Sequence, residues 1–175
     1  MLRLALQSDA IQLAELRWLS REEHDQRAEP LEIFTPRFTA WLVTAFGSGL
    51  WLAAVASGGA QLTGCMFLQR IATVPVPGGA STREWGYVTH AYVRPPYRRQ
   101  GLGTSLLELL IDQACHLNLH ELHVWPSVAA VSLYTRAGFL SPEEVRAAVP
   151  PDAPSYVLPL KQVGSITSRD DQSGK

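Results

Sequence analysis

A basic turn that contains two glycines, residues 94–104, is the segment of this sequence best suited to chemistry. It follows an apolar run that ends at Val93 and precedes a long amphipathic run that begins at Leu102. The first turn of a helix presents unpaired backbone N–H groups and the positive end of the helix dipole. Glycines let an anion approach those groups, and Arg98 and Arg99 add positive charge. The turn therefore predicts a cradle for a pyrophosphate, and the alternative is an ordinary glycine turn before a core helix.

Two familiar phosphate motifs do not fit this turn. A P-loop needs a lysine after its last glycine, but Gly103 is followed by Thr104 and Ser105. A dinucleotide fingerprint needs a third small residue, and Leu106 stands there. Glu121 has roughly the spacing of a ribose-binding acid, but it opens the next expected strand instead of ending it. These departures argue against an ATP-binding P-loop and against an NAD domain.

The elements that must position this turn alternate between strands and helices. Alternating or apolar-rich short runs predict strands and i,i+4 apolar pairs predict helices, with Ser8 and Asp9 as N-caps of the first helix. A glycine turn at 57–59 predicts an antiparallel hairpin, and 73–83 is expected to be a flexible excursion. The expected strands cover residues 2–6, 50–56, 62–71, 85–93, 121–125 and 156–160, and the expected helices 11–19, 36–46, 102–117 and 128–137.

Composition limits the class of protein. The chain has 175 residues, 46% of them hydrophobic and 18% charged, so we expect a globular fold. Its net charge of −1 gives no global reason to bind nucleic acid or an anionic membrane. The longest apolar run, 50–56, is far shorter than the roughly 20 residues of a membrane-spanning helix. Two cysteines, both expected to be buried, and no signal peptide fit a reducing, cytoplasmic location.

Two motifs together resemble the GCN5-related N-acetyltransferase (GNAT) superfamily. Residues 98–103, Arg-Arg-Gln-Gly-Leu-Gly, match its acetyl-CoA pattern, and residues 133–139, Leu-Tyr-Thr-Arg-Ala-Gly-Phe, resemble its "LYxxxGF" element. The element order β-α-α-β-β-β-α-β-α-β also agrees with that family. The resemblance implies a mixed α/β fold with a mostly antiparallel central sheet flanked by helices. It implies one acetyltransferase domain over residues 1–161, with 162–175 as a disordered tail.

The resemblance also implies where acetyl-CoA binds as co-substrate. Main-chain groups of Ala91 and Val93 would bind the pantetheine arm where the strand bulges and splays, and the amides of residues 99–104 would bind the pyrophosphate. Many members have Asn where this chain has Ser127, a departure that puts that contact in doubt. The implied cofactor-binding residues are Ala91, Tyr92, Val93, Arg98, Arg99, Gln100, Gly101, Leu102, Gly103, Thr104, Ser127 and Tyr134.

Acetyl transfer to an amine needs an acid for the departing thiolate and a route for the proton of the amine. The resemblance places Tyr134 as the acid, and the alternative is a core aromatic. A main-chain N–H at Val93 or its neighbour would stabilise the oxyanion. His90 and Glu84 are the candidate bases, against a buried hydrogen-bonded histidine and an exposed carboxylate. A water molecule or an amine that arrives neutral would make either base unnecessary.

The acceptor and the partners are less constrained. The acidic residues of the segment 22–32 could attract a cationic amine or could form a solvated helix face; they are Glu22, Glu23, Asp25, Glu29 and Glu32. His116, His120 and His123 straddle a helix end without cysteine ligands, so no metal is expected. The acceptor could be a small-molecule or a peptide amine, and relatives are often homodimers. An acyl-CoA sensor without turnover is the alternative function.

Overall fold

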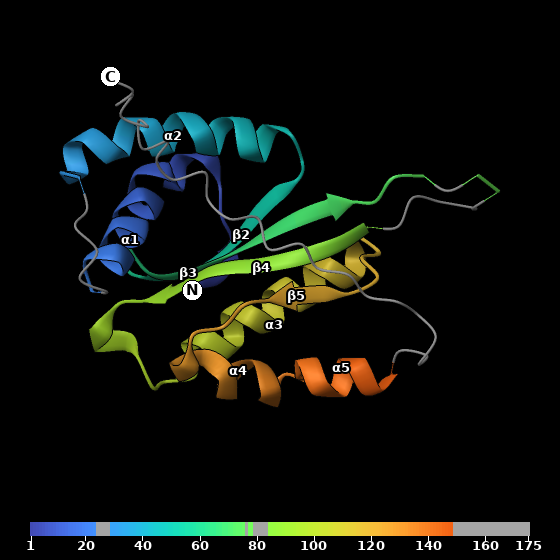
Figure 1. Ribbon diagram of the computed structural model, residues 1–175. Coiled ribbons are helices and arrows are strands. Elements are labelled where there is room, and N and C mark those ends of the chain that lie inside the picture. The colour runs from blue at the N-terminus through green and yellow to red at the C-terminus, as the bar shows by residue number, and fades with distance from the viewer. Residues whose placement is uncertain (24–28, 76, 79–83, 149–175) are drawn as a thin grey trace, which may run out of the picture. The chain divides into compact units, whose positions relative to one another are not determined.

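The computed structural model describes residues 1–23, 29–75, 77–78 and 84–148. Residues 1–139 form one compact unit, and a second unit begins at Leu140. Within the described ranges five strands form one sheet in the order β1-β2-β3-β4-β5 (Figure 1). The strands are β1 (Leu2–Leu4), β2 (Trp51–Gly58), β3 (Gln61–Ala72), β4 (Glu84–Val93) and β5 (Leu122–Val124). The α-helices are α1 (Ala10–Glu22), α2 (Leu31–Gly47), α3 (Leu102–His116), α4 (Val131–Arg136) and, in the second unit, α5 (Pro142–Ala148).

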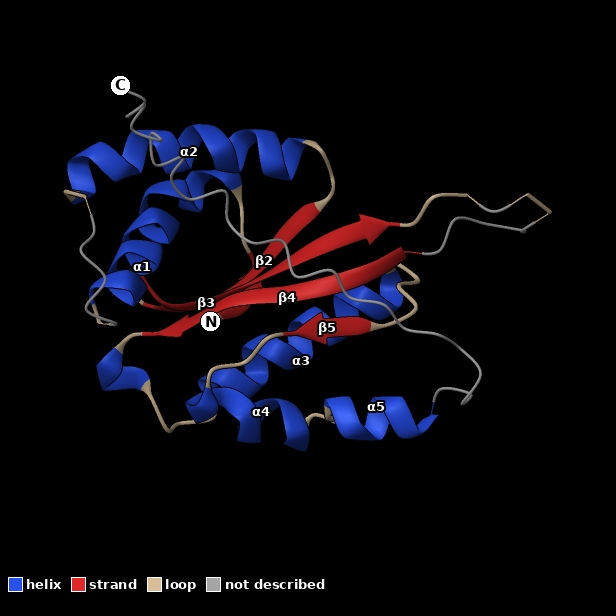
Figure 2. Cartoon of the chain, viewed as in Figure 1, coloured by secondary structure: helices blue, strands red, loops and turns tan. Residues whose placement is uncertain are grey.

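Helices cover both faces of the sheet in the first unit, with α1 and α2 on one face and α3 and α4 on the other (Figure 2). Alternation along the strands divides the core accordingly, because successive side chains point to opposite faces. Phe67 of β3 joins the cluster with Leu13 and Leu42, whereas its neighbour Leu68 joins the cluster with Leu106. The predicted fold class, a mixed and mostly antiparallel sheet between helices, is confirmed.

The sheet is antiparallel except at its last pair. Strands β2 and β3 form the expected hairpin, and β4 runs antiparallel to β3. Strand β5 then runs parallel to β4, because α3 carries the chain back across the sheet between them. None of the helices in the described part of the chain is long and apolar enough to cross a bilayer.

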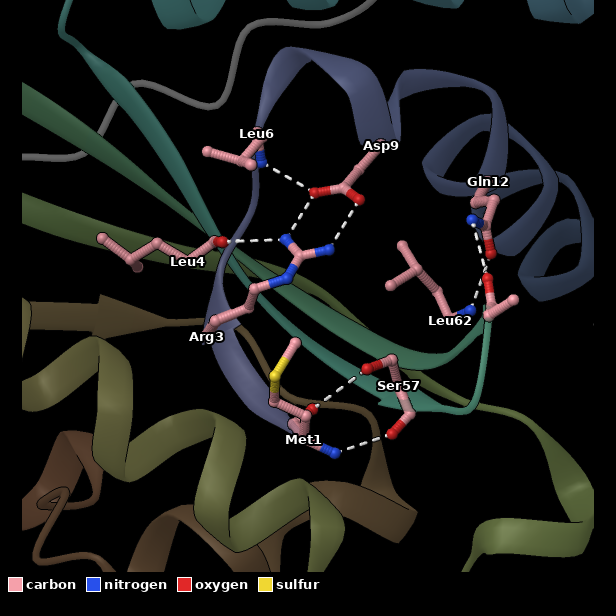
Figure 3. Close-up of polar contacts among 9 residues, drawn as sticks. Met1, Arg3, Leu4, Leu6, Asp9, Gln12, Ser57 and Leu62 are labelled. Carbon is pink, nitrogen blue, oxygen red and sulfur yellow. Dashed lines mark hydrogen bonds and ion pairs between the residues drawn. The ribbon is translucent and has the colours of Figure 1, made fainter.

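Asp9 does not cap α1 through its side chain, contrary to the sequence expectation. Its buried carboxylate instead accepts hydrogen bonds from Arg3 Nη1 at 2.6 Å, Arg3 Nη2 at 2.8 Å and the backbone N–H of Leu6 at 2.7 Å (Figure 3). These bonds, with Arg3 the larger cause, hold the pKa of Asp9 below its usual value. The fixed partner on β1 outcompetes the helix N–H groups, and the bridge fastens β1 to the start of α1.

The second helix begins earlier than expected. The sequence predicts it from Pro36, since proline favours the first turn of a helix. The structure starts α2 at Leu31 and places Pro36 inside it. Thr35 Oγ1 donates to the carbonyl of Leu31 at 2.7 Å, and Phe34 packs against the core cluster. Tertiary packing of this early turn therefore compensates for the hydrogen bond that proline removes.

The structure also differs from the sequence predictions at one cysteine and at one helix. Cys65 is buried as expected, but Cys115 is exposed, because it lies on the solvent side of α3. Helix α5 was not predicted, although Ser141, Pro142 and two glutamates at its start are typical of a helix N-terminus. The expected strand 156–160 and the proposed tail 162–175 lie outside the described residues.

Candidate active site

Strand β4 has two halves with different neighbours. Its residues Gly86–Val88 pair with β3 on one edge and with β5 on the other. Beyond Val88 the pairing with β5 ends, while the pairing with β3 continues to Val93. The splay expected from the family resemblance is therefore present, and among the described residues no strand covers the second edge of residues 89–93.

The open half also contains a bulge. The register shifts between Cys65 and Phe67 of β3, so that both His90 and Ala91 stand opposite Met66. His90 has φ 47°, a left-handed conformation that is uncommon for a residue with a Cβ. Bulges of this kind redirect side chains and end regular pairing. Ala91 is exposed in this bulge, at the position implied for the pantetheine arm.

The cradle, residues 94–104, is a tight turn that leads from β4 into α3. It opens with a 3-10 helix, η2 (Pro95–Tyr97), and Gln100 Nε2 donates to the carbonyl of Pro96 at 3.0 Å. Arg99 has φ 61° and Gly101 has φ 80°, so two left-handed residues turn the chain. The first-turn amides, at Leu102, Gly103 and Thr104, receive no side-chain cap, since the N-cap is Gly101. Such a helix start is suited to an anion.

Arg98 is held by groups of the protein. Its Nη2 donates to Glu23 Oε2 at 2.6 Å, and its Nε donates to the carbonyl of Val93 at 2.7 Å. The guanidinium carbon also lies 5.5 Å from the centre of the Tyr92 ring. The positive charge that the sequence assigns to the cradle is thus partly neutralised at Arg98. Arg99 is exposed, and no ion pair holds it within the described residues.

Glu23 joins the end of α1 to the cradle and to β4. Besides binding Arg98, its Oε1 accepts a hydrogen bond from the Tyr92 hydroxyl at 2.6 Å. Burial, and then this hydrogen bond, raise the pKa of Tyr92 to about 12, which keeps the phenol neutral. The sequence marks Glu23 only as one of several acids, and nothing in its local pattern indicates this network.

Tyr134 lies on α4 and is only 5% exposed. It belongs to the buried cluster that contains Val88 and Leu106, and its ring meets Phe139 in a T-shaped contact, 5.5 Å between ring centres. Burial, with a smaller contribution from the phenol of Tyr87, raises its pKa above the usual value. Among the described residues its hydroxyl has no hydrogen-bond partner, so the proton is available to a ligand.

Ser127 precedes the 3-10 helix η3 (Val128–Ala130), which leads into α4. The residue is exposed, and its carbonyl accepts the N–H of Ala130 at 2.9 Å. Its hydroxyl makes no capping bond to η3. A serine at this position can still donate and accept a hydrogen bond, although it reaches less far than the amide of asparagine.

The two candidate bases are held in different ways. His90 Nδ1 lies 2.9 Å from Arg17 Nη1, and burial, followed by the charge of Arg17, lowers the pKa of His90 to about 3. Glu84 is bound by Arg70, Nη2 to Oε2 at 2.6 Å. It lies six residues before His90, about 20 Å along an extended strand. The structure therefore does not bring the two candidates together.

Two of the four described acidic residues of the segment 22–32 are engaged in pairs. Glu23 binds Tyr92 and Arg98, and Glu29 forms an ion pair with Arg37. Glu22 and Glu32 are exposed, whereas Asp25 lies outside the described residues.

A row of aromatic side chains that the sequence did not connect runs from α2 to the bulge. Phe38 and Trp41 of α2 lie 6.5 and 6.3 Å from Phe67 of β3, and Phe67 lies 5.6 Å from the His90 ring. Trp41 is 40% exposed. The contacts join residues far apart in sequence, so no local pattern indicates them. This row gives the bulge an apolar wall on the α1 and α2 face.

Residues 10–139 match the Acetyltransferase (GNAT) family, which covers the bulge, the cradle and α4. The chain belongs to this family. A search of curated proteins finds no significant match.

Solved structures agree with this fold. A predicted acetyltransferase with acetyl-CoA from Clostridium acetobutylicum has a TM-score of 0.67 at 23% identity, over 82% of this chain and 92% of that one. A GCN5-related N-acetyltransferase from Ralstonia eutropha JMP134 has a TM-score of 0.66 at 20% identity, over 90% and 97%. Glucosamine-6-phosphate N-acetyltransferase from Arabidopsis thaliana has a TM-score of 0.66 at 12% identity, over 94% and 98%. At these identities the similarity establishes the fold.

Proposed function

We propose that this protein is an N-acetyltransferase that transfers the acetyl group of acetyl-CoA to a primary amine by direct attack in a ternary complex. The observation that carries the proposal is the uncapped start of α3, with Gly101 at φ 80°, beside the bulged and open half of β4. The first would bind the pyrophosphate and the second the pantetheine arm. Membership of the acetyltransferase family and a structural neighbour crystallised with acetyl-CoA support this ligand.

The reaction forms one bond and breaks one. The amine nitrogen attacks the thioester carbonyl carbon, and an N–H of β4 at Val93 or its neighbour stabilises the oxyanion. The carbon–sulfur bond then breaks, Tyr134 gives its proton to the departing sulfur, and the phenolate takes a proton back from solvent. Burial keeps the Tyr134 phenol protonated at neutral pH, so it has a proton to give, although the raised pKa also makes it a weaker acid.

The proton of the amine leaves by another route in this proposal. The lone pair of His90 at Nδ1 faces a guanidinium, and Glu84 is paired with Arg70 well away from the bulge. We therefore assign the proton of the amine to water. We further propose a cytoplasmic location and a small-molecule or peptide acceptor.

A non-catalytic acyl-CoA sensor is the second candidate, and the engagement of both candidate bases is the observation that favours it. Calorimetric titration with acetyl-CoA, using NAD and ATP as controls, tests the site that both candidates share. We expect selective micromolar binding of acetyl-CoA. Thiol release measured over a panel of primary amines then separates the two: turnover supports the enzyme, and binding without turnover supports the sensor. Absence of acetyl-CoA binding would contradict both.

A further inference from the structure

The protonation state of His90 follows from its contact with Arg17 of α1. Arg17 Nη1 lies 2.9 Å from His90 Nδ1. A guanidinium has only donors, so Nδ1 must accept this hydrogen bond. A neutral imidazole that accepts at Nδ1 carries its hydrogen at Nε2. The contact with Arg17 therefore fixes the tautomer of His90 and occupies the lone pair that a base would use.

The other nitrogen of the ring is an unmatched donor. His90 Nε2 exposes less than 1 Å² of surface and has no hydrogen-bond partner among the described residues, so a ligand oxygen reaches it only when a neighbouring side chain shifts. A buried N–H without a partner is costly, and so is the left-handed backbone of His90 at φ 47°. Both costs fall on one residue of the bulge, next to Ala91 at the open edge of β4. Strain and unmatched polar groups cluster at functional sites, where a ligand supplies the missing partner.

The charged surroundings of His90 disfavour its protonated form. From α1, Arg17 and Arg21 are both positive, and the charge of Arg21 lowers the pKa of Arg17 in turn, after burial. From β3, Cys65 is a neutral thiol, since burial raises its pKa to about 12, and Phe67 offers only its ring. None of the contacts described for His90 is with a carboxylate, so nothing there would balance an imidazolium.

We propose that Arg17 is a positioning residue that holds His90 as a neutral N–H donor, and that His90 Nε2 donates to an oxygen of the ligands that meet at the bulge. The effect of this donor on catalysis rests on the proposed acetyl transfer. It replaces the expected role of His90 as a base by that of a fixed donor. If substitution of His90 lowers kcat, the partner of Nε2 is the thioester oxygen. If the substitution raises KM for the amine, the partner is an oxygen of the acceptor.

The tautomer can be tested without any enzymatic activity. NMR of the imidazole nitrogens in ¹⁵N-histidine-labelled protein, with His90→Gln to assign the signals, reports which nitrogen carries hydrogen between pH 5 and 9. We expect hydrogen on Nε2 of His90 and no titration in this range. Arg17→Met should free Nδ1 and allow the hydrogen to move to it, although burial, the larger cause of the low pKa of His90, remains. Arg21→Met, which removes a charge from the same helix, should leave the tautomer unchanged. Hydrogen on Nδ1, or titration near pH 6.5 in the wild type, would overturn the proposal.

Activity tests the donor itself. Thiol release with an accepted amine should fall at least about tenfold in His90→Leu and recover in part in His90→Gln, whose amide retains an N–H donor. The pH profile of wild-type kcat/KM should lack a limb near 6.5, because burial and then Arg17 hold the pKa of His90 at about 3. Equal activity of His90→Leu and wild type would overturn the donor role. Absence of turnover with every amine would instead count against the proposed function, and the NMR result would still decide the tautomer.

Discussion

The two halves of β4 belong to one strand but serve different purposes. The half that contains Gly86 and Val88 pairs on both edges, and Val88 is fully buried. The half that contains His90 and Ala91 pairs on one edge only, bulges, and holds a left-handed residue. The first half is closed by packing, whereas in the second half, among the described residues, one strand edge is unpaired and His90 Nε2 has no hydrogen-bond partner. The comparison shows how one strand can anchor a sheet and open a binding edge within ten residues.

The largest effect should come from the acid beside the open half. Tyr134→Phe removes the proton for the leaving sulfur and should lower kcat at least about 100-fold, a typical contribution of general acid catalysis. Binding of acetyl-CoA should stay within about twofold, since the ring and its packing remain. Thiol release and calorimetry measure the two quantities. Ser132→Ala, which removes an exposed hydroxyl from the same helix, is the control, and an unchanged kcat in Tyr134→Phe would exclude this acid.

The closed half should respond through stability instead. A Cβ at Gly86 would lie 2.5 Å from Leu122 Cδ2 and 2.7 Å from Leu68 Cδ1. We expect Gly86→Val to lower the free energy of unfolding by about 1–3 kcal/mol through overpacking. Urea denaturation measures it, with Gly47→Ala as the control, because a Cβ at Gly47 meets nothing within 4 Å. A variant that kept its stability but lost acetyl-CoA binding would reverse the assigned roles of the two halves.

The cradle offers a matched pair of glycines. Gly101 has φ 80°, and an alanine in this left-handed conformation costs roughly 1 kcal/mol. Gly101→Ala should therefore weaken acetyl-CoA binding about tenfold by displacing the first-turn amides. At Gly103 an added Cβ would make only an ordinary contact, 3.7 Å from Leu133 Cδ2. Gly103→Ala should bind acetyl-CoA with an affinity within about twofold of wild type. Calorimetry in which Gly103→Ala bound acetyl-CoA more weakly than Gly101→Ala would refute this geometry.

The smallest effect concerns the link between Glu23 and the open half. The pKa of Tyr92 is raised to about 12, from an ordinary value near 10 in the unfolded chain. Its contribution to stability is therefore complete below pH 10 and is lost as the pH rises from 10 toward 12. Tyr92→Phe should cost about 1 kcal/mol or less at pH 8, and this difference from wild type should shrink above pH 10.

Urea denaturation at pH 8, 10 and 11 measures this difference. Glu23→Gln is the companion variant, because it removes the charged acceptor of the Tyr92 hydroxyl and should weaken the same pH dependence. A difference between wild type and Tyr92→Phe that stays constant across these pH values would show that Tyr92 titrates normally in the folded protein.

The sequence by itself determined the elements whose signals are local. Helix α3 follows from its i,i+4 apolar pairs, and the hairpin of β2 and β3 follows from two apolar-rich runs on either side of a glycine turn. The cradle was also local, since Gly101 and the helix start lie within a few residues of each other. Neighbours along the chain fix these conformations, so a single sequence contains enough information to predict them. Errors arose where packing moved a boundary, as at Pro36 in α2.

Only the tertiary structure decided the chemical state of the candidate site. Arg17 and His90 are 73 residues apart, and Glu23 and Arg98 are 75 apart, yet each pair is in direct contact. From the sequence His90 had the pKa of a free imidazole and was a reasonable base. In the fold, burial and a guanidinium make it a neutral donor. Residue types determine which side chains could donate or accept a proton. Burial and contacts between distant segments determine which of those side chains are protonated in the folded protein.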